Sequence, residues 1–197
     1  MPLPSPLDRH AREDLRYIRE TMARAGAFSA VPGWGTALVG ASALLVAALA
    51  PAVRARSGGP GWLLAWGVEL LVAVLIIAVA LPRKARATGE DVLSGPARRF
   101  FTSFLVPAAV AAVLTIALAR AGAWELVPGA WLSLYGCALV AGWGGLTREV
   151  VPGMGLSFVA LGAAAFLTPT WGDAWLALGF GGFHVFIGLL IARRYGG

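Results

Sequence analysis

The sequence predicts an all-α polytopic membrane protein, a bundle of six transmembrane helices preceded by a cytoplasmic amphipathic helix. Three observations lead to this fold class. The 197 residues are 58% hydrophobic and only 13% charged, whereas soluble domains carry about 25% charged residues. Six stretches are apolar enough to cross ~30 Å of hydrocarbon. The basic residues are strongly biased toward one side of these stretches. We therefore expect residues 1–26 to form the amphipathic helix and residues 27–197 the membrane domain.

The amphipathic helix is predicted for residues 5–25, where Ser5, Pro6 and Asp8 form a favourable helix start. Apolar residues recur at spacings of three and four, which gives one narrow stripe along this helix. The stripe that we expect to meet a partner consists of Leu7, Leu15, Ile18 and Met22. Two kinds of surface could bury this stripe. One is the membrane interface or the protein's own loops. The other is a partner helix from another copy or from a different protein.

The six predicted spans follow this helix and differ in length. They cover about 29–51, 61–82, 102–119, 124–144, 151–168 and 174–192. The third and fifth are the shortest, so a count of four or five spans with a re-entrant segment is the alternative. Six of the eight tryptophans fall near one set of span ends. Tryptophan is enriched at membrane interfaces, so we interpret these six as an aromatic belt.

Basic residues predict the orientation, because cytoplasmic loops of membrane proteins carry an excess of Lys and Arg. With six spans, thirteen of the 16 Lys and Arg residues lie on the side of the two termini. The other side has Arg54, Arg56 and Arg120. We therefore expect both termini in the cytoplasm. The basic charge suits anionic lipid headgroups, so the lipid bilayer is the expected partner and nucleic acid is not.

Two distant segments have similar sequences, and we call this similarity the echo. "ARAGAFSAVPGWG" at residues 23–35 is followed 96 positions later by "ARAGAWELVPGAW" at residues 119–131. One interpretation is a 3+3 inverted repeat, with halves of about 27–120 and 121–197 related by a two-fold axis in the membrane plane, as in transporters. The other is helix-start chemistry, since proline suits the first turn of a helix and a third Val-Pro-Gly opens the fifth span.

Two ionisable residues lie deep in predicted spans. Glu69 lies eight residues after Gly61, and His184 lies eleven residues after Asp173. At 1.5 Å per residue these depths are roughly 12 and 16 Å from the same side, so the two side chains could meet. Tyr135 adds a hydroxyl in the fourth span. The structural interpretation is a buried hydrogen bond between helices, and the functional one is a proton- or cation-responsive site.

Glycines in the last two spans predict close helix packing. Gly155 and Gly162 lie in the fifth span, and Gly182 and Gly188 lie in the sixth. Small residues let helix backbones approach each other in a membrane. We therefore expect the fifth and sixth spans to form the most tightly packed part of the bundle.

Motifs for catalysis or cofactor binding are missing from the sequence. A single cysteine and two histidines make no metal-type spacing, and no nucleotide fingerprint occurs. Haem binding through two axial histidines would need a symmetric dimer or another ligand. We therefore expect no enzymatic activity, no metal and no cofactor.

Three segments carry a resemblance to known proteins: "LRYIRETMARAGAFSAVPGWG", "VPGAWLSLYG" and "GFGGFHVFIGLLIARRYGG". With them, the chain resembles a family of uncharacterised bacterial six-span membrane proteins over most of its length. The resemblance implies the six-span architecture and a location in the inner membrane of a bacterium. The family has no assigned activity, so the resemblance implies no catalytic residues.

Two functions from different classes remain. The leading hypothesis is a non-enzymatic association or regulatory module that presents its N-terminal helix to a membrane-complex partner or to another copy in a homo-oligomer. The alternative is a small proton- or cation-coupled transporter or channel that uses Glu69 and His184 near the membrane midplane.

Overall fold

The structure, a computed structural model, describes residues 14–15, 17–18, 30–89, 91–92, 94–142 and 150–195. Every regular element within these ranges is a helix. The predicted all-α class is therefore confirmed for the described part of the chain. The two short N-terminal pieces are helical, and the rest of the predicted helix at residues 5–25 lies outside the described residues.

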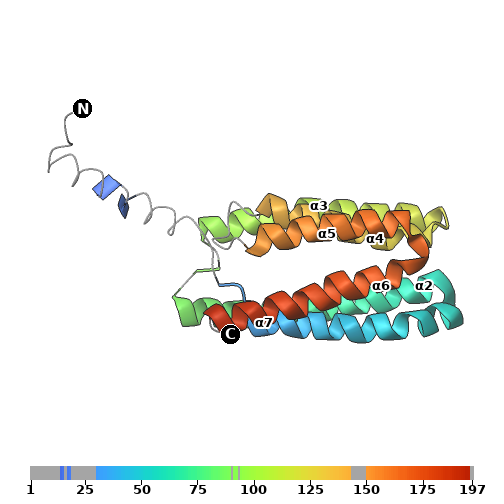
Figure 1. Ribbon diagram of the computed structural model, residues 1–197, viewed down its shortest axis with the longest axis horizontal. Helices are drawn as coiled ribbons and strands as arrows, with labels where there is room; N and C mark the ends of the chain where they lie inside the picture. Colours follow the sequence, from blue (N-terminus) through green and yellow to red (C-terminus); the bar gives the residue numbers. More distant parts are fainter. Residues whose placement is uncertain are drawn as a thin grey trace, which may run out of the picture.

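Helix α2, Gly33–Thr88, is a hairpin of two arms that turns at Gly58. Gly58 has φ 64° and ψ −161°, a backbone conformation that essentially only glycine adopts. The Ser42 hydroxyl of the first arm (residues 33–57) lies 2.8 Å from Glu69 Oε1 of the second arm (residues 59–88). Figure 1 shows the two arms side by side, from blue to green.

The remaining helices follow with short connections. They are α3 (Gly95–Arg120), the 3₁₀ turn η1 (Trp124–Leu126), α4 (Val127–Gly142), α5 (Val150–Leu167), the 3₁₀ turn η3 (Pro169–Trp171), α6 (Gly172–Leu176), the π-helical segment η4 (Ala177–Phe183) and α7 (His184–Tyr195). Ser94 starts α3 by accepting a hydrogen bond from the Ala97 backbone N–H. The segments α6, η4 and α7 follow one another without a break.

Four helices of the described chain are long and apolar enough to cross a membrane. They cover Gly33–Thr88, Ala97–Arg120, Trp124–Gly142 and Pro169–Arg194, and Gly153–Leu167 is a shorter apolar helix. The count differs from six because α2 contains the first two predicted spans and the fifth is short. The prediction of a helical protein with apolar helices long enough to span a membrane is therefore confirmed.

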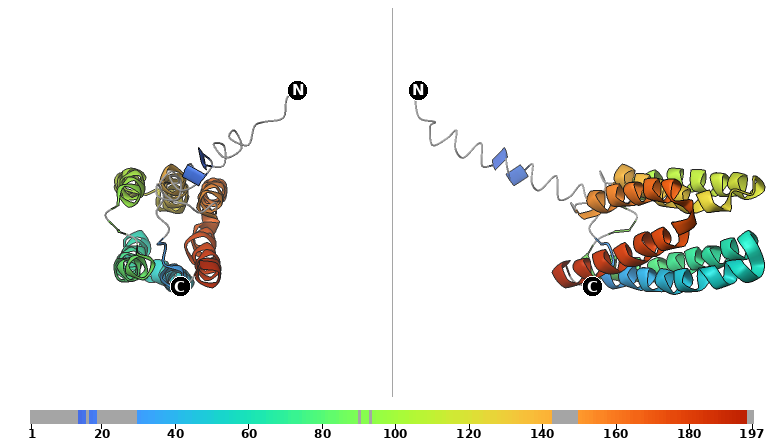
Figure 2. Two further views of the ribbon diagram at one scale, coloured as in Figure 1. Left: turned by 90° about the vertical axis from the view of Figure 1, so that its left-hand side faces the viewer. Right: turned by 45° about the vertical axis from the view of Figure 1, so that its right-hand side comes forward.

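The helices form a bundle of two layers. Helices α3, α4 and α5 make one layer, and the arms of α2 with α6, η4 and α7 make the other (Figure 1). Viewed along the helices in Figure 2, left, the chain passes around the bundle in order, from the first arm to the second, then α3, α4, α5 and α7. Helix α7 closes the ring against the first arm, where Gly188 lies on Ala37.

This ring order bears on the echo between residues 23–35 and 119–131. The two predicted halves wind around the bundle in the same sense (Figure 2). A two-fold axis in the membrane plane reverses the sense of winding when both halves are viewed from one side. The order of helices is therefore that of a continuous up-and-down bundle, and it favours helix-start chemistry as the origin of the echo.

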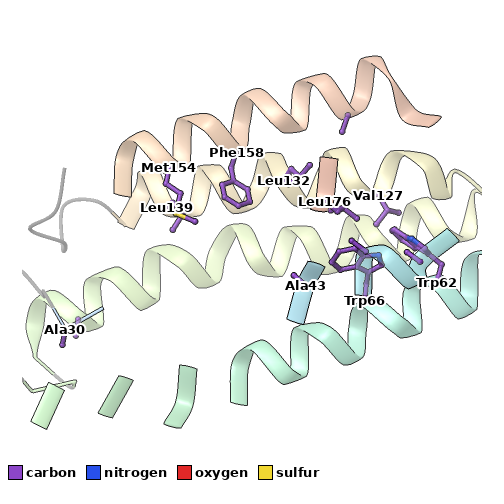
Figure 3. Close-up of a cluster of buried hydrophobic side chains, with 14 of the residues drawn as sticks. Ala30, Ala43, Trp62, Trp66, Val127, Leu132, Leu139, Met154, Phe158 and Leu176 are labelled. Carbon is purple, nitrogen blue, oxygen red and sulfur yellow. The ribbon is translucent and has the colours of Figure 1, made fainter. Parts of the chain in front are cut away.

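Tryptophans occupy the core at the end of the bundle where α2 turns. Trp62 is fully buried and stacks on Trp131 at 5.6 Å between ring centroids, while Trp66 meets Trp131 edge-on at 6.4 Å. Figure 3 shows Trp62 and Trp66 beside Val127 and Leu176. These side chains join helices, so the interpretation of Trp62 and Trp66 as belt residues at the lipid interface was wrong. Burial against neighbouring helices outweighs the interfacial preference of their rings.

Candidate functional site

His184 is the first residue of α7 and directly follows the π-helical segment η4. Three of the seven residues of η4 are glycine, namely Gly179, Gly181 and Gly182. Glycine lowers the preference for a regular α-helix, and π-turns occur mostly as short segments, often at functional sites. The wide turn leaves the Gly179 carbonyl oxygen 3.3 Å from His184 Nδ1.

Both ring nitrogens of His184 have hydrogen-bond partners. The Tyr135 hydroxyl oxygen in α4 lies 2.7 Å from His184 Nε2. Because a carbonyl oxygen only accepts hydrogen bonds, Nδ1 carries the proton and donates to Gly179. In the neutral imidazole Nε2 then accepts from the Tyr135 O–H, so both ring nitrogens bond to groups of the protein itself.

Aromatic rings enclose the Tyr135–His184 pair. Tyr135 lies 5.5 Å from Phe104, 4.8 Å from Phe158 and 5.1 Å from Phe180, measured between ring centroids. Phe158 also lies 5.6 Å from the His184 ring. Phe158 is fully buried, and Figure 3 shows it in the core with Leu132, Leu139 and Met154. The surroundings of the pair are aromatic and closely packed.

Glu69 lies in the hairpin of α2 and is 6% exposed. Its Oε1 accepts a hydrogen bond from Ser42 at 2.8 Å. The Ser42 hydroxyl also lies 3.0 Å from the Val39 carbonyl oxygen. Ser42 was not singled out in the sequence, because a serine in an Ala-rich span is easily taken for a packing residue.

The contacts of the first arm set the height of Glu69 relative to His184. A Cβ atom on Gly40 would lie 2.5 Å from the Val185 nitrogen, and one on Gly181 would lie 2.6 Å from Leu44 Cγ. Ser42 lies between Gly40 and Leu44 in the sequence, so Ser42 and its partner Glu69 are level with residues 181–185. The two polar groups therefore share a height, yet within the described chain their hydrogen bonds go to different partners.

A second polar cluster joins α2 to α6 at the end where α2 turns. Trp62 Nε1 donates to Asp173 Oδ1 at 2.6 Å. Arg54 Nε lies 3.9 Å from Asp173 Oδ2, and its guanidinium carbon lies 4.4 Å from the centre of the Trp62 ring. The sequence analysis missed this cluster. The available signal was that Trp62 and Asp173 both lie near span ends on the same side.

Three of the four glycines named from the sequence lie in close contact with a neighbouring helix. A Cβ on Gly155 would lie 3.0 Å from the Gly136 carbonyl oxygen, and one on Gly162 would meet Ser133. Both contacts join α5 to α4. Gly188 joins α7 to the first arm of α2. Close packing therefore pairs α5 with α4 and α7 with α2. Small residues permit such close approach without specifying the partner helix.

Gly182 has no such role. A Cβ atom there would have its nearest neighbour in Leu178 of its own helical segment at 3.6 Å, which is ordinary contact. Gly182 is better explained by the π-helical geometry of η4 than by close approach of two helices.

Two residues of the predicted partner stripe are described. Leu15 and Ile18 are helical, and they are 54% and 50% exposed. They lie three residues apart, which places them on one face of a helix. Leu7 and Met22 lie outside the described residues.

Among the described residues, no group of three or more His, Cys, Asp and Glu side chains is placed to hold a metal ion. Comparison with protein-family models, with curated proteins and with solved structures finds no match to this chain. The chemistry of its own residues is therefore the basis for assigning a function.

Proposed function

We propose that this chain is a non-enzymatic association or regulatory module of the bacterial inner membrane, similar to the six-span family that its sequence resembles. It crosses the membrane six times, with each arm of α2 and helix α5 counted as a span. The unequal distribution of Lys and Arg supports cytoplasmic termini. In this proposal the bundle is a rigid anchor, and residues 1–26 present an apolar stripe to a partner or to another copy.

One observation carries this proposal. Leu15 and Ile18 lie on a helix and are about half exposed, so the described bundle does not cover them. An apolar stripe on a charged helix gains stability when another surface buries it, at about 25 cal/mol per Å². The polar groups of the bundle support the anchor role, because Glu69, Tyr135 and His184 bond to groups of the same chain.

The test is removal of the stripe. Deleting residues 1–25, or replacing Leu15 and Ile18 together with serine, should reduce the size of the complex in mild detergent, measured by light scattering after gel filtration. Tyr17→Ser is the matched control, because Tyr17 is exposed but lies off the stripe. Protease should remove the segment from inside-out vesicles only. An unchanged complex size and unchanged co-purifying proteins for both stripe variants would refute the association function.

A transporter or channel is the second candidate, and the buried carboxyl of Glu69 beside Ser42 favours it. An ionisable residue at membrane depth is a functional hypothesis by default. In this reading Glu69 exchanges a proton or binds a cation at the height of His184. We expect Glu69→Gln to abolish proton-dependent flux into vesicles while the gel-filtration profile stays unchanged, with Glu125→Gln as a control in η1. Flux that is insensitive to Glu69→Gln would remove this candidate.

A further inference from the structure

An open groove runs along the outside of the bundle between the two arms of α2. Its volume is about 620 Å³. Leu38 forms one wall from the first arm, and Leu75 and Val79 form the other from the second arm. All three side chains are more than half exposed. The arms touch beneath them, where Gly35 lies against Ala80.

One end of this groove is basic. Arg83 and Lys84 line it there, together with Trp34 of the first arm. Trp34 is also exposed. These residues lie near the start of the first arm and the end of the second, which is the end of the bundle that also carries Arg86, Arg98 and Arg99. Tryptophan and basic side chains at a span end are typical of the headgroup level of a membrane.

The length of the groove matches one leaflet. Its lining residues on the second arm run from Leu75 to Ala87, which corresponds to roughly 18 Å at 1.5 Å per residue. Half of the ~30 Å hydrocarbon core is about 15 Å. An apolar groove of this length with cations at one end is complementary to a single phospholipid. Its phosphate would lie at Arg83 and an acyl chain beside Leu38 and Val79.

We propose that this groove binds an anionic phospholipid in preference to a zwitterionic one. The inference goes beyond the association function, and it rests only on the arms of α2 being embedded in the bilayer. Arg83 is the residue that selects the headgroup charge, because the ammonium group of a zwitterionic headgroup offsets the phosphate charge that attracts the exposed guanidinium of Arg83. The apolar walls hold the acyl chain and contribute equally to the binding of both lipid classes.

The experiment uses the full chain in mild detergent, with phosphatidylglycerol or phosphatidylethanolamine of the same acyl chains added, and counts bound lipid by native mass spectrometry. The wild type should retain phosphatidylglycerol about five-fold better, as expected for one basic residue near the headgroup. Arg83→Gln should abolish that preference. Arg99→Gln is the matched control, because Arg99 is exposed near the start of α3 and does not line the groove.

A second variant tests the apolar part of the groove. Leu38→Trp fills it, so retention of both lipids should fall by a similar factor while the gel-filtration profile stays unchanged. A preference for phosphatidylglycerol that survives Arg83→Gln, or lipid retention that survives Leu38→Trp, would overturn the proposal. A dimer without bound lipid that dissociates on Leu38→Trp would identify a second copy as the occupant and also overturn it. Complex formation through residues 1–25 is measured separately, so the two proposals can fail independently.

Discussion

Replacing Gly40 with valine should unfold the bundle or separate α7 from α2. The added Cβ would lie 2.5 Å from the Val185 nitrogen and 2.6 Å from the Gly181 carbonyl oxygen. Both are backbone atoms, so no change of rotamer relieves the clash and the helices must move apart. Overpacking a core usually lowers the free energy of unfolding by about 1–3 kcal/mol. Because this clash involves backbone atoms, we expect a loss at or above the upper end of that range. The free energy of unfolding, measured by denaturant titration in detergent, should fall accordingly.

Gly136→Val should have an effect of the same size, because a Cβ there would lie 2.6 Å from the Gly155 carbonyl oxygen and 2.7 Å from the Val159 nitrogen. Gly67→Val is the matched control. Gly67 is exposed, lies inside a helix, and has no atom within 4 Å of a Cβ built on it. Equal unfolding midpoints for Gly40→Val and Gly67→Val would show that the α2–α7 contact is not as close as described.

Trp62→Ala is expected to be the most destabilising truncation at the other end of the bundle, by about 3–5 kcal/mol. The change removes the stacking on Trp131, the hydrogen bond to Asp173 and the contact with Arg54. Trp62→Phe should be intermediate, because it keeps an aromatic ring and removes the N–H donor. The measurement is again the free energy of unfolding in detergent.

Trp171→Ala provides the comparison for this prediction. Trp171 lies near the same span ends but is 64% exposed, so its truncation leaves no internal cavity. We expect a change of less than about 1 kcal/mol, as for most exposed positions. If Trp62→Ala and Trp171→Ala have the same effect, the Trp62 cluster does not hold α2 to α6.

These glycine contacts bear on the echo between residues 23–35 and 119–131. Gly40 and Gly136 are also 96 positions apart, and each lies against the backbone of a neighbouring helix. Gly40 meets α7 of the opposite end of the chain, whereas Gly136 meets α5, the next helix along. The similarity thus includes two glycines that each pack against a neighbouring helix. The two glycines differ in how far along the chain their partner helices lie.

Hydropathy and helix geometry were enough to predict a helical protein with helices apolar enough for a membrane, and to place Glu69 and His184 at a similar height. These properties depend on hydropathy and on the constant rise of a helix, which are local. The sequence also placed Tyr135 among the polar candidates. The orientation and the count of six spans stay predictions from charge and length.

Which side chains meet could not be predicted without the packed bundle. The pairing of His184 with Tyr135, of Glu69 with Ser42 and of Trp62 with Asp173 depends on the rotation of each helix about its axis. The long helices of the described bundle are apolar on most of their faces, so periodicity does not distinguish the face toward lipid from the face toward protein. Steric fit between glycine faces and aromatic rings makes that choice, and fit is a property of two surfaces that are distant in the sequence.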